Sequence, residues 1–271
     1  MNYNLKDIYG LQALSGDTNQ AYVGYLDEKK VFIKKNSTPF FIAVANEDLA
    51  PHLVWSKNID GSLWLAQEWI EGQSLKRTDV MYFKDQLMGI LSKLHKSDYL
   101  ALMLYRLEGR EMEPIDFLQE YYWQLPRDLE NDWLLSKVYR ELEDNIPEFN
   151  HLNICACHGD LNHKNMMFKD INNQEIYVID WDSAILSDVF GDLGTVLYRY
   201  VYVHLWDDWL RSYGLFPDEE SIQKIWWYGE MQQLMHIKRQ YQKGRMQLVK
   251  EEIEHLRIMN EQKEKYYESQ K

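Results

Sequence analysis

A strand-like segment between two stretches of helical pattern is the feature that most constrains the fold of this chain. Residues 165–169 and 176–179 have the composition of short strands, and residues 171–173 between them have that of a hairpin turn. The region before the hairpin instead repeats apolar residues at helical spacing, at Phe83, Leu87, Ile90, Leu91 and Leu94. The polar residues at the two ends of the hairpin are Asp160, Asn165 and Asp180.

The first 70 residues are predicted to form a separate lobe that contains a sheet. Apolar runs with turn residues between them predict five strands, at residues 8–14, 21–26, 30–34, 53–55 and 63–69. A short helix is predicted over residues 40–49, and Asp128 is expected to cap a later one. We predict an α+β chain with two lobes, an N-terminal antiparallel sheet lobe over residues 1–70 and a larger helical lobe over residues 71–271.

The formal net charge of −13 bears on the partners of the protein. Duplex DNA and anionic membranes gain nothing from a net negative protein, so we expect no nucleic-acid partner. The N-terminal residues lack the pattern of a secretory signal, and charged residues interrupt the aromatic stretch at residues 198–210. We therefore expect a cytoplasmic protein without membrane insertion. Cys155 and Cys157 are expected to be buried thiols, because a single intervening residue is poor geometry for a disulfide bond.

The residues around the hairpin have the types and spacing that phosphoryl transfer needs. The sequence reads HGDLNHKN at residues 158–165, and the second predicted strand ends in IDWD at residues 179–182. Phosphoryl transfer requires a base beside the acceptor hydroxyl and oxygen ligands for Mg²⁺ on the phosphates. Asp160 can supply the base, and Asn165 and Asp180 can supply the ligands. The histidines and carboxylates also suit a transition-metal hydrolase, but Asn165 has no role in such a site.

These motifs resemble those of the aminoglycoside phosphotransferase and choline kinase superfamily, whose members have a protein-kinase-like fold and phosphorylate small molecules. The resemblance extends upstream to EWIEGQSL at residues 68–75. Downstream it extends to GDLGTVL, which contains Asp192. The carboxylate of Asp192 is expected to brace the catalytic loop from the start of a helix.

The resemblance implies a Mg-ATP-dependent enzyme that binds ATP between its two lobes. Asp160 would be the catalytic base, and His158 would shape the loop beside it at the catalytic centre. Asn165 and Asp180 would be Mg²⁺ ligands. Asp182 would be either a further metal-binding carboxylate or a cap of the loop.

The N-terminal lobe contains the candidate nucleotide-binding residues. Lys34 ends a predicted strand in the order VFIK, as does the kinase lysine that neutralises nucleotide phosphates. Glu47, on the predicted short helix, is the expected partner of this lysine. Ser15 and Gly16 lie between the first two strands, where a loop covers the phosphates, although the sequence has no G-x-G-x-x-G motif. At the boundary of the lobes, the residues expected to offer backbone groups to the adenine are Glu68, Trp69 and Ile70.

Three candidate acceptor-binding residues lie in the last third of the chain: Trp206, Trp227 and Glu230. The tryptophans either stack on a ring-shaped substrate or pack in the core between helices. Glu230 shares a helical face with apolar residues, where a carboxylate is costly unless it has a partner. That partner is either an acceptor hydroxyl or one of the cations Arg199, Lys238 and Arg239.

Within the superfamily, KKNSTPFF at residues 34–41, together with the two hairpin motifs, most resembles the YtmP/CcrZ-type proteins of Firmicutes. This narrower resemblance implies an alcohol acceptor that contains ribose or deoxyribose, such as a nucleoside. It also implies a role in cell-cycle control, with a cell-division protein as partner.

Two alternatives to this function stay open. One is a regulatory scaffold of the same fold that binds a division or replication partner. The other is an aminoglycoside- or choline-type kinase, whose cationic substrate would be attracted by the acidic residues at 207, 208 and 218–220.

Overall fold

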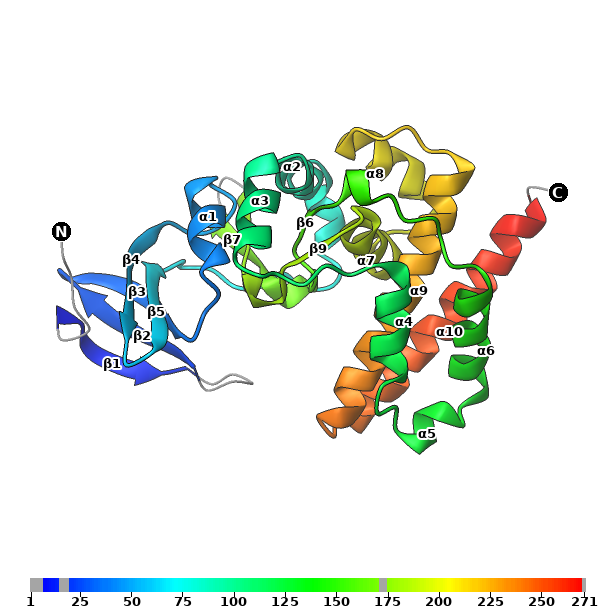
Figure 1. The fold of residues 1–271 in the computed structure, drawn as a ribbon, viewed down its shortest axis with the longest axis horizontal. Helices are drawn as coiled ribbons and strands as arrows, with labels where there is room; N and C mark the ends of the chain where they lie inside the picture. Colours follow the sequence, from blue (N-terminus) through cyan, green and yellow to red (C-terminus); the bar gives the residue numbers. More distant parts are fainter. Residues whose placement is uncertain (1–6, 15–19, 171–174, 270–271) are drawn as a thin grey trace.

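A five-stranded antiparallel sheet forms the N-terminal lobe of the computed structural model, which describes residues 7–14, 20–170 and 175–269 (Figure 1). The strand order is β1-β2-β3-β5-β4. Ile33 and Ala66 are fully buried in a small core on one face of the sheet, because side chains alternate between the two faces of each strand. The bounds of the strands are β1 Tyr9–Ala13, β2 Ala21–Leu26, β3 Lys29–Lys35, β4 Leu53–Ile59 and β5 Ser62–Glu68.

The short helix α1 (Phe40–Asn46) packs against the helical lobe. Its apolar side chains Phe40 and Val44 are fully buried. The ring of Phe40 meets Trp181 of the second lobe edge-on, with a distance of 6.3 Å between ring centroids. The predicted helix is confirmed, although it ends before residue 49 because Glu47 already forms its C-cap. This contact gives the two lobes a shared apolar core beside the cleft between them.

The second lobe is mainly helical (Figure 1). The sheet lies at one end of the molecule and α4, α6, α9 and α10 lie at the other, with α2, α3 and α7 between them. Helices α7 and α9 approach closely at Gly229, where a Cβ would lie 2.5 Å from the Cβ of Tyr198. The bounds are α2 Lys84–His95, α3 Asp98–Arg106, α4 Pro114–Tyr122, α5 Arg127–Glu130, α6 Trp133–Asp144, α7 Phe190–Tyr200, α8 Trp206–Tyr213, α9 Glu219–Gln242 and α10 Met246–Ser269.

The capping residue of α6 differs from the prediction. Asp132, not Asp128, is the N-cap, and its side chain accepts hydrogen bonds from the backbone N–H groups of Leu134 and Leu135. Asp128 lies within the separate short helix α5, where it accepts a hydrogen bond from Tyr241. The predicted helix is therefore present, but its N-cap lies four residues later than expected.

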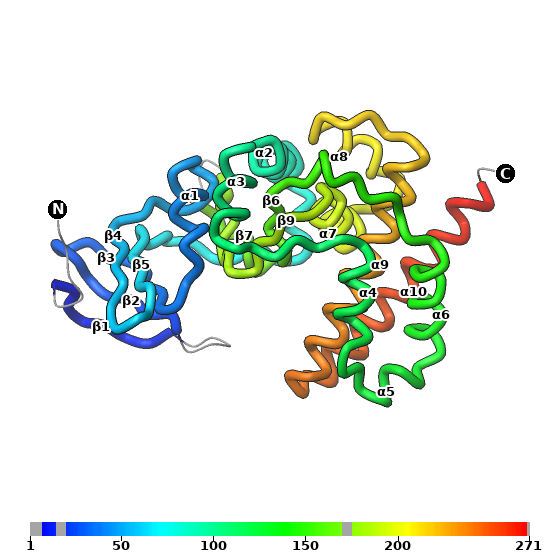
Figure 2. The backbone as a smooth tube through the Cα atoms, in the orientation of Figure 1, coloured from blue at the N-terminus to red at the C-terminus, as the bar shows by residue number. Residues whose placement is uncertain are grey.

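Two short antiparallel pairs of strands lie in the middle of the molecule, next to α2 and α3 (Figure 2). β7 (Met166–Asp170) pairs with β8 (Glu175–Val178), which confirms the two predicted hairpin strands; the turn residues lie outside the described residues. β6 (Cys155–Cys157) pairs with β9 (Ile185–Ser187). The segment that joins the lobes is bonded to the hairpin, since Leu75 N–H donates to the carbonyl of Met166 at 2.8 Å. The hairpin is thereby fixed at the floor of the cleft.

No helix in the described part of the chain combines the length and the apolar character that a membrane span requires.

Candidate active site

The loop between β6 and β7 contains Asp160, and a glycine determines its path. Gly159 has a φ of 76°, in the left-handed region that favours glycine. A Cβ at this position would also overlap the backbone carbonyl oxygen of Ser183. The loop can therefore approach the segment after β8 this closely only because residue 159 has no side chain.

Replacing Gly159 by alanine is expected to damage both stability and activity. The variant must move the loop away from Ser183 and adopt a strained backbone conformation, which costs on the order of 3 kcal/mol of unfolding free energy. Chemical denaturation with a parallel activity assay measures both effects. Gly89 is a matched control, because a Cβ at this helical position meets no atom within 4 Å. A stable and fully active Gly159→Ala variant would contradict this account of the loop.

A buried carboxylate holds the start of the loop. Asp192, on the first turn of α7, accepts hydrogen bonds from the backbone N–H groups of His158 and Gly159 at 2.7 and 3.1 Å. It also contacts Nε2 of His95 at 3.1 Å. Burial alone would raise the pKa of Asp192, but the hydrogen bonds from the His95 side chain and the His158 backbone lower it below its ordinary value. Asp192 thus stays ionised and braces the loop, in the geometry that the sequence predicted.

His158 is fully buried, and both of its ring nitrogens have backbone partners. Nε2 lies 3.0 Å from the carbonyl oxygen of Ile179, so it carries the proton and donates it. Nδ1 accepts a hydrogen bond from the N–H group of Asp160 at 3.2 Å. The imidazole therefore links the loop to the end of β8. This geometry suits the expected loop-shaping role and leaves neither nitrogen available to a substrate.

The side chain of Asp160 is held on one side only. Its Oδ2 accepts hydrogen bonds from the amide groups of Asn162 and Asn165, at 3.1 and 3.2 Å. Its Oδ1 lies 3.5 Å from Nη1 of Arg239, on α9. One oxygen is thus fixed by neutral donors from the loop, and the other faces a guanidinium group at the edge of the cleft. This orientation suits a carboxylate that receives a proton at Oδ1.

Lys34, at the end of β3, binds two carboxylates across the cleft. Its Nζ lies 2.6 Å from Oδ1 of Asp180 and 2.7 Å from Oδ2 of Asp182. Burial lowers the pKa of Lys34, but these two carboxylates outweigh burial and hold it above its ordinary value. Asp180 adopts a left-handed conformation, with a φ of 65°. The lysine therefore remains cationic, and it brings together the N-terminal lobe and the end of the hairpin.

The expected pairing of Lys34 with Glu47 is not found among the described contacts. Glu47 is the C-cap residue of α1, and its backbone carbonyl accepts a hydrogen bond from Lys93 of α2. The helix ends before it can present the Glu47 side chain to β3. Asp180 and Asp182 are the residues that contact the amine of Lys34 instead.

Asp182 also connects the lobes through its second oxygen. Oδ1 of Asp182 accepts hydrogen bonds from the hydroxyl of Ser37 and the N–H group of Thr38, at 3.2 and 3.1 Å. The residue therefore caps the connection between β3 and α1 while its Oδ2 binds Lys34. Asp182 was expected to be either a metal-binding carboxylate or a cap of the loop. The capping contact is present in the structure, and Oδ2 of the same carboxylate still faces the cleft.

A cavity of 380 Å³ lies between the lobes, and most of the predicted nucleotide-binding residues line it. Its floor contains Asn165 and Asp180 from the hairpin, and its roof contains Lys34. Its inner end contains the three boundary residues Glu68, Trp69 and Ile70. Ser15 and Gly16 lie outside the described residues, although the neighbouring Leu14 and Ala21 line the cavity. We call this space the donor cavity.

A second cavity of 230 Å³ adjoins the loop on the side of α4 and α9. Gly159, Asp182 and Arg239 are among its lining residues. Asp182 lines both cavities, so the two spaces meet at this residue. We call the second space the acceptor cavity. Sequence patterns gave no signal for the lining residues from α4 and α9, because these helices are distant from the motifs in sequence.

The donor set in the cleft fits Mg²⁺. Since the amide nitrogen of Asn165 donates to Asp160, its Oδ1 is the atom left for a cation. Asp180 and Asp182 add carboxylate oxygens. Oxygen ligands without histidine or cysteine are the set that Mg²⁺ prefers in sites that also bind phosphates.

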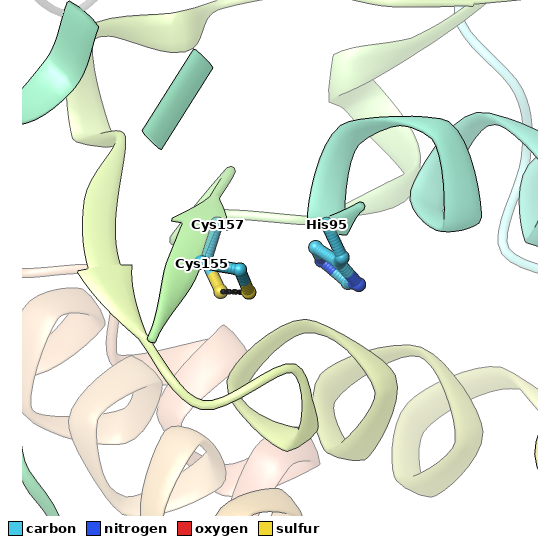
Figure 3. A group of neighbouring side chains, drawn as sticks. All are labelled: His95, Cys155 and Cys157. Carbon is cyan, nitrogen blue, oxygen red and sulfur yellow. Dashed lines mark hydrogen bonds between the residues drawn. The ribbon is translucent and has the colours of Figure 1, made fainter. Parts of the chain in front are cut away.

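A different cluster, formed by His95, Cys155 and Cys157, lies buried beneath the loop (Figure 3). The two cysteines are free thiols with their sulfurs 3.6 Å apart, which agrees with the predicted buried thiols. The ring nitrogens of His95 already contact Tyr213 and Asp192, at 3.0 and 3.1 Å. These contacts leave the imidazole no free nitrogen for a metal, and they indicate that the cluster supports Asp192.

The structure places Trp206, Trp227 and Glu230 away from both cavities. The tryptophans are 1% and 4% exposed, and their indole N–H groups donate to backbone carbonyls. They follow the core-packing alternative. Glu230 is fully buried, and its partner is Lys263 of α10 at 2.7 Å, rather than Arg199, Lys238 or Arg239. These three cations do not contact Glu230, because α10 covers this face of α9. The position of α10 could not be predicted from the sequence.

Glu230 and Glu252 are expected to have opposite effects on stability as pH changes. Burial raises the pKa of Glu230, and Lys263 only partly opposes this. Burial would also raise the pKa of Glu252, but His236, Arg199 and Gln233 lower it. A carboxylate whose pKa is higher in the folded state than in the unfolded state stabilises the protein at pH values below its unfolded-state pKa. This stabilisation is lost as the pH rises through the folded-state pKa. A carboxylate whose pKa is lower in the folded state stabilises the protein at pH values above its unfolded-state pKa. This stabilisation is lost as the pH falls through the folded-state pKa.

We therefore expect Glu230→Gln to gain unfolding free energy relative to the wild type as pH rises from 4 to 8. Glu252→Gln should be less stable than the wild type throughout pH 5–8, with the deficit shrinking at more acidic pH. Denaturant titrations at each pH measure both differences. Parallel pH profiles for the two variants would show that the two carboxylates are not in these opposite environments.

Comparisons with known proteins agree with this geometry. The model of the phosphotransferase enzyme family matches residues 39–222. The structure of the choline kinase LicA from Streptococcus pneumoniae superposes with a TM-score of 0.65 and 18% identity, covering 93% of this chain and 94% of the other. The GDP complex of aminoglycoside 2′-phosphotransferase-IIIa gives a TM-score of 0.66 and 14% identity, covering 94% of each chain. These structures confirm the predicted two-lobed, protein-kinase-like α+β fold.

Proposed function

Because this chain belongs to the phosphotransferase enzyme family, we propose that it is a Mg-ATP-dependent small-molecule kinase that transfers phosphate where its two cavities meet. The observation that carries this proposal is the shared position of Asp182 between the donor and acceptor cavities. Asp160 lies 3.5 Å from Arg239, which lines the acceptor cavity, and Lys34 contacts Asp182 from the opposite lobe. A base, a cation and oxygen ligands are thus gathered at one point between two spaces for substrates.

The nucleotide would occupy the donor cavity. Its apolar walls, which include Phe32, Leu65 and Met167, suit an adenine ring, and the backbone of residues 68–70 offers the polar groups for its edge. The ammonium of Lys34 would neutralise the phosphates. Mg²⁺ would be held by Asn165, Asp180 and Asp182, and would neutralise charge on the phosphates. The structure of LicA in complex with AMP, which superposes with a TM-score of 0.62, supports a nucleotide as a ligand of this fold.

The acceptor would place its hydroxyl over Asp160. Asn162 and Asn165 fix Oδ2 of the carboxylate, so Oδ1 accepts the hydroxyl proton as the oxygen attacks the γ-phosphate. His158 and Asp192 position the loop but contact no substrate in this arrangement. The protein therefore acts chiefly by positioning the reactants and stabilising charge, which is how phosphoryl transfer is generally catalysed.

For the acceptor, we propose an alcohol that contains ribose or deoxyribose, such as a nucleoside. The support is the narrower sequence resemblance given by KKNSTPFF at residues 34–41. On the same support we propose a role in cell-cycle control with a cell-division protein as partner. The cytoplasmic location is proposed separately, from the N-terminal sequence and the charges that interrupt the aromatic stretch. Growth complementation by an Asp160 variant separates catalysis from a scaffold role, because a scaffold requires no base.

The test is ATP consumption by the purified protein in the presence of magnesium, against ribose, deoxyribose, nucleosides, choline and aminoglycosides. Turnover with ribose-containing acceptors, abolished by EDTA, is the expected result. Turnover with choline or an aminoglycoside alone would confirm the kinase and reject the proposed acceptor. If none of these acceptors is consumed, the proposed function is rejected.

A further inference from the structure

The acceptor cavity has an unusual distribution of charge for a protein with a net charge of −13. Each carboxylate that lines or borders it, among the described residues, already has a cationic partner. Glu120 pairs with Arg110, and Asp182 pairs with Lys34 at 2.7 Å. Asp160 lies 3.5 Å from Nη1 of Arg239. The cations beside these carboxylates offset the attraction that each would otherwise exert on an ammonium group of an incoming acceptor.

The remaining lining of this cavity also disfavours a cation. Recognition of quaternary ammonium groups such as that of choline generally uses several aromatic faces. Among the described lining residues, Phe117 is the one aromatic side chain, and the other apolar walls are formed by Met112, Ile185 and Met235. Gln232 and Arg239, both on α9, supply hydrogen-bonding groups. Apolar side chains combined with these hydrogen-bonding groups suit a hydroxylated ring with no positive charge.

We infer that Arg239 is a specificity-determining residue, which admits uncharged hydroxylated acceptors such as sugars and nucleosides and excludes acceptors that carry an ammonium group. The inference rests on the proposed function. Arg239 sets the charge balance at the reacting end of the cavity, because its guanidinium offsets the negative charge of the Asp160 oxygen that receives the hydroxyl. An acceptor ammonium at this point would meet a like charge a few ångströms away, in a cleft partly shielded from water.

The experiment compares two acceptors that differ in one charge: a nucleoside that the enzyme phosphorylates, and its 3′-amino-3′-deoxy analogue at a pH where the amine is protonated. The enzymes are the wild type, Arg239→Gln and Arg239→Lys. Arg257→Gln is the matched control, since Arg257 is an exposed arginine of α10 that pairs with Glu254. The measured quantity is the ratio of kcat/KM for the neutral acceptor to kcat/KM for the amine.

The wild type should prefer the neutral nucleoside by about tenfold or more, because like charges repel strongly at this separation. Arg239→Gln should lower this ratio by about fivefold or more, even where it slows both reactions, whereas Arg239→Lys and Arg257→Gln should keep it. An unchanged ratio in Arg239→Gln, or a wild type that prefers the amine, would overturn the inference while leaving the kinase intact. Failure of the proposed function appears differently, as a wild type that phosphorylates no nucleoside when the neutral acceptor is being chosen, and it would reject the inference as well.

Discussion

Replacing Asp160 by asparagine is expected to lower kcat by about a thousandfold, the usual contribution of a positioned general base. The asparagine has the same shape, and its side-chain oxygen can still accept hydrogen bonds from Asn162 and Asn165. The variant loses the charge at Oδ1, which accepts the hydroxyl proton in the proposed reaction. The measurement is steady-state ATP consumption, together with the acceptor product.

Two controls separate a chemical effect from damage to the fold. The unfolding free energy of Asp160→Asn should change little, because this side chain is only partly buried and keeps its loop contacts. The affinity for Mg-ATP should also be retained, since the donor cavity is not lined by Asp160. A variant that binds nucleotide normally and turns over at more than a tenth of the wild-type rate would show that Asp160 is not the base.

Strands and helices could be predicted from the sequence where the buried face of the element requires apolar residues at a regular spacing. The strands of the N-terminal lobe and the hairpin strands β7 and β8 alternate side chains between faces, and each was predicted within a few residues. The cap of α6 was not predicted correctly. Asp128 and Asp132 both precede the same apolar positions, and only the backbone path decides which carboxylate meets the free N–H groups of Leu134 and Leu135.

The candidate site was predictable only where its residues lie in one motif or end a patterned strand. The segment from His158 to Asn165 folds into one loop, so its residues come together by local geometry. Lys34 was located because it ends a strand, but its contact with Asp180 depends on how the two lobes meet. Arg239 carries no local signal, since it is one basic residue in a long helix that tertiary packing brings to Asp160.

Replacing Asp180 by asparagine is the second change for which we expect a large effect, a loss of activity of about a thousandfold or more. The variant removes a carboxylate that lies 2.6 Å from Lys34 and belongs to the donor set that fits Mg²⁺. Unlike Asp160→Asn, it should also weaken the magnesium dependence of nucleotide binding. Titration of a fluorescent ATP analogue with and without magnesium distinguishes the two variants.

The stability of Asp180→Asn should change by no more than about 1 kcal/mol, because the pair is partly exposed and Lys34 keeps its contact with Asp182. Asp208→Asn is a matched control: Asp208 also lies 2.6 Å from a lysine, Lys84, but on the surface near α2 and outside both cavities. The control should be fully active. If Asp180→Asn bound nucleotide with the same magnesium dependence as this control, Asp180 would not be a metal ligand. Its contact with Lys34 would then serve only to join the two lobes.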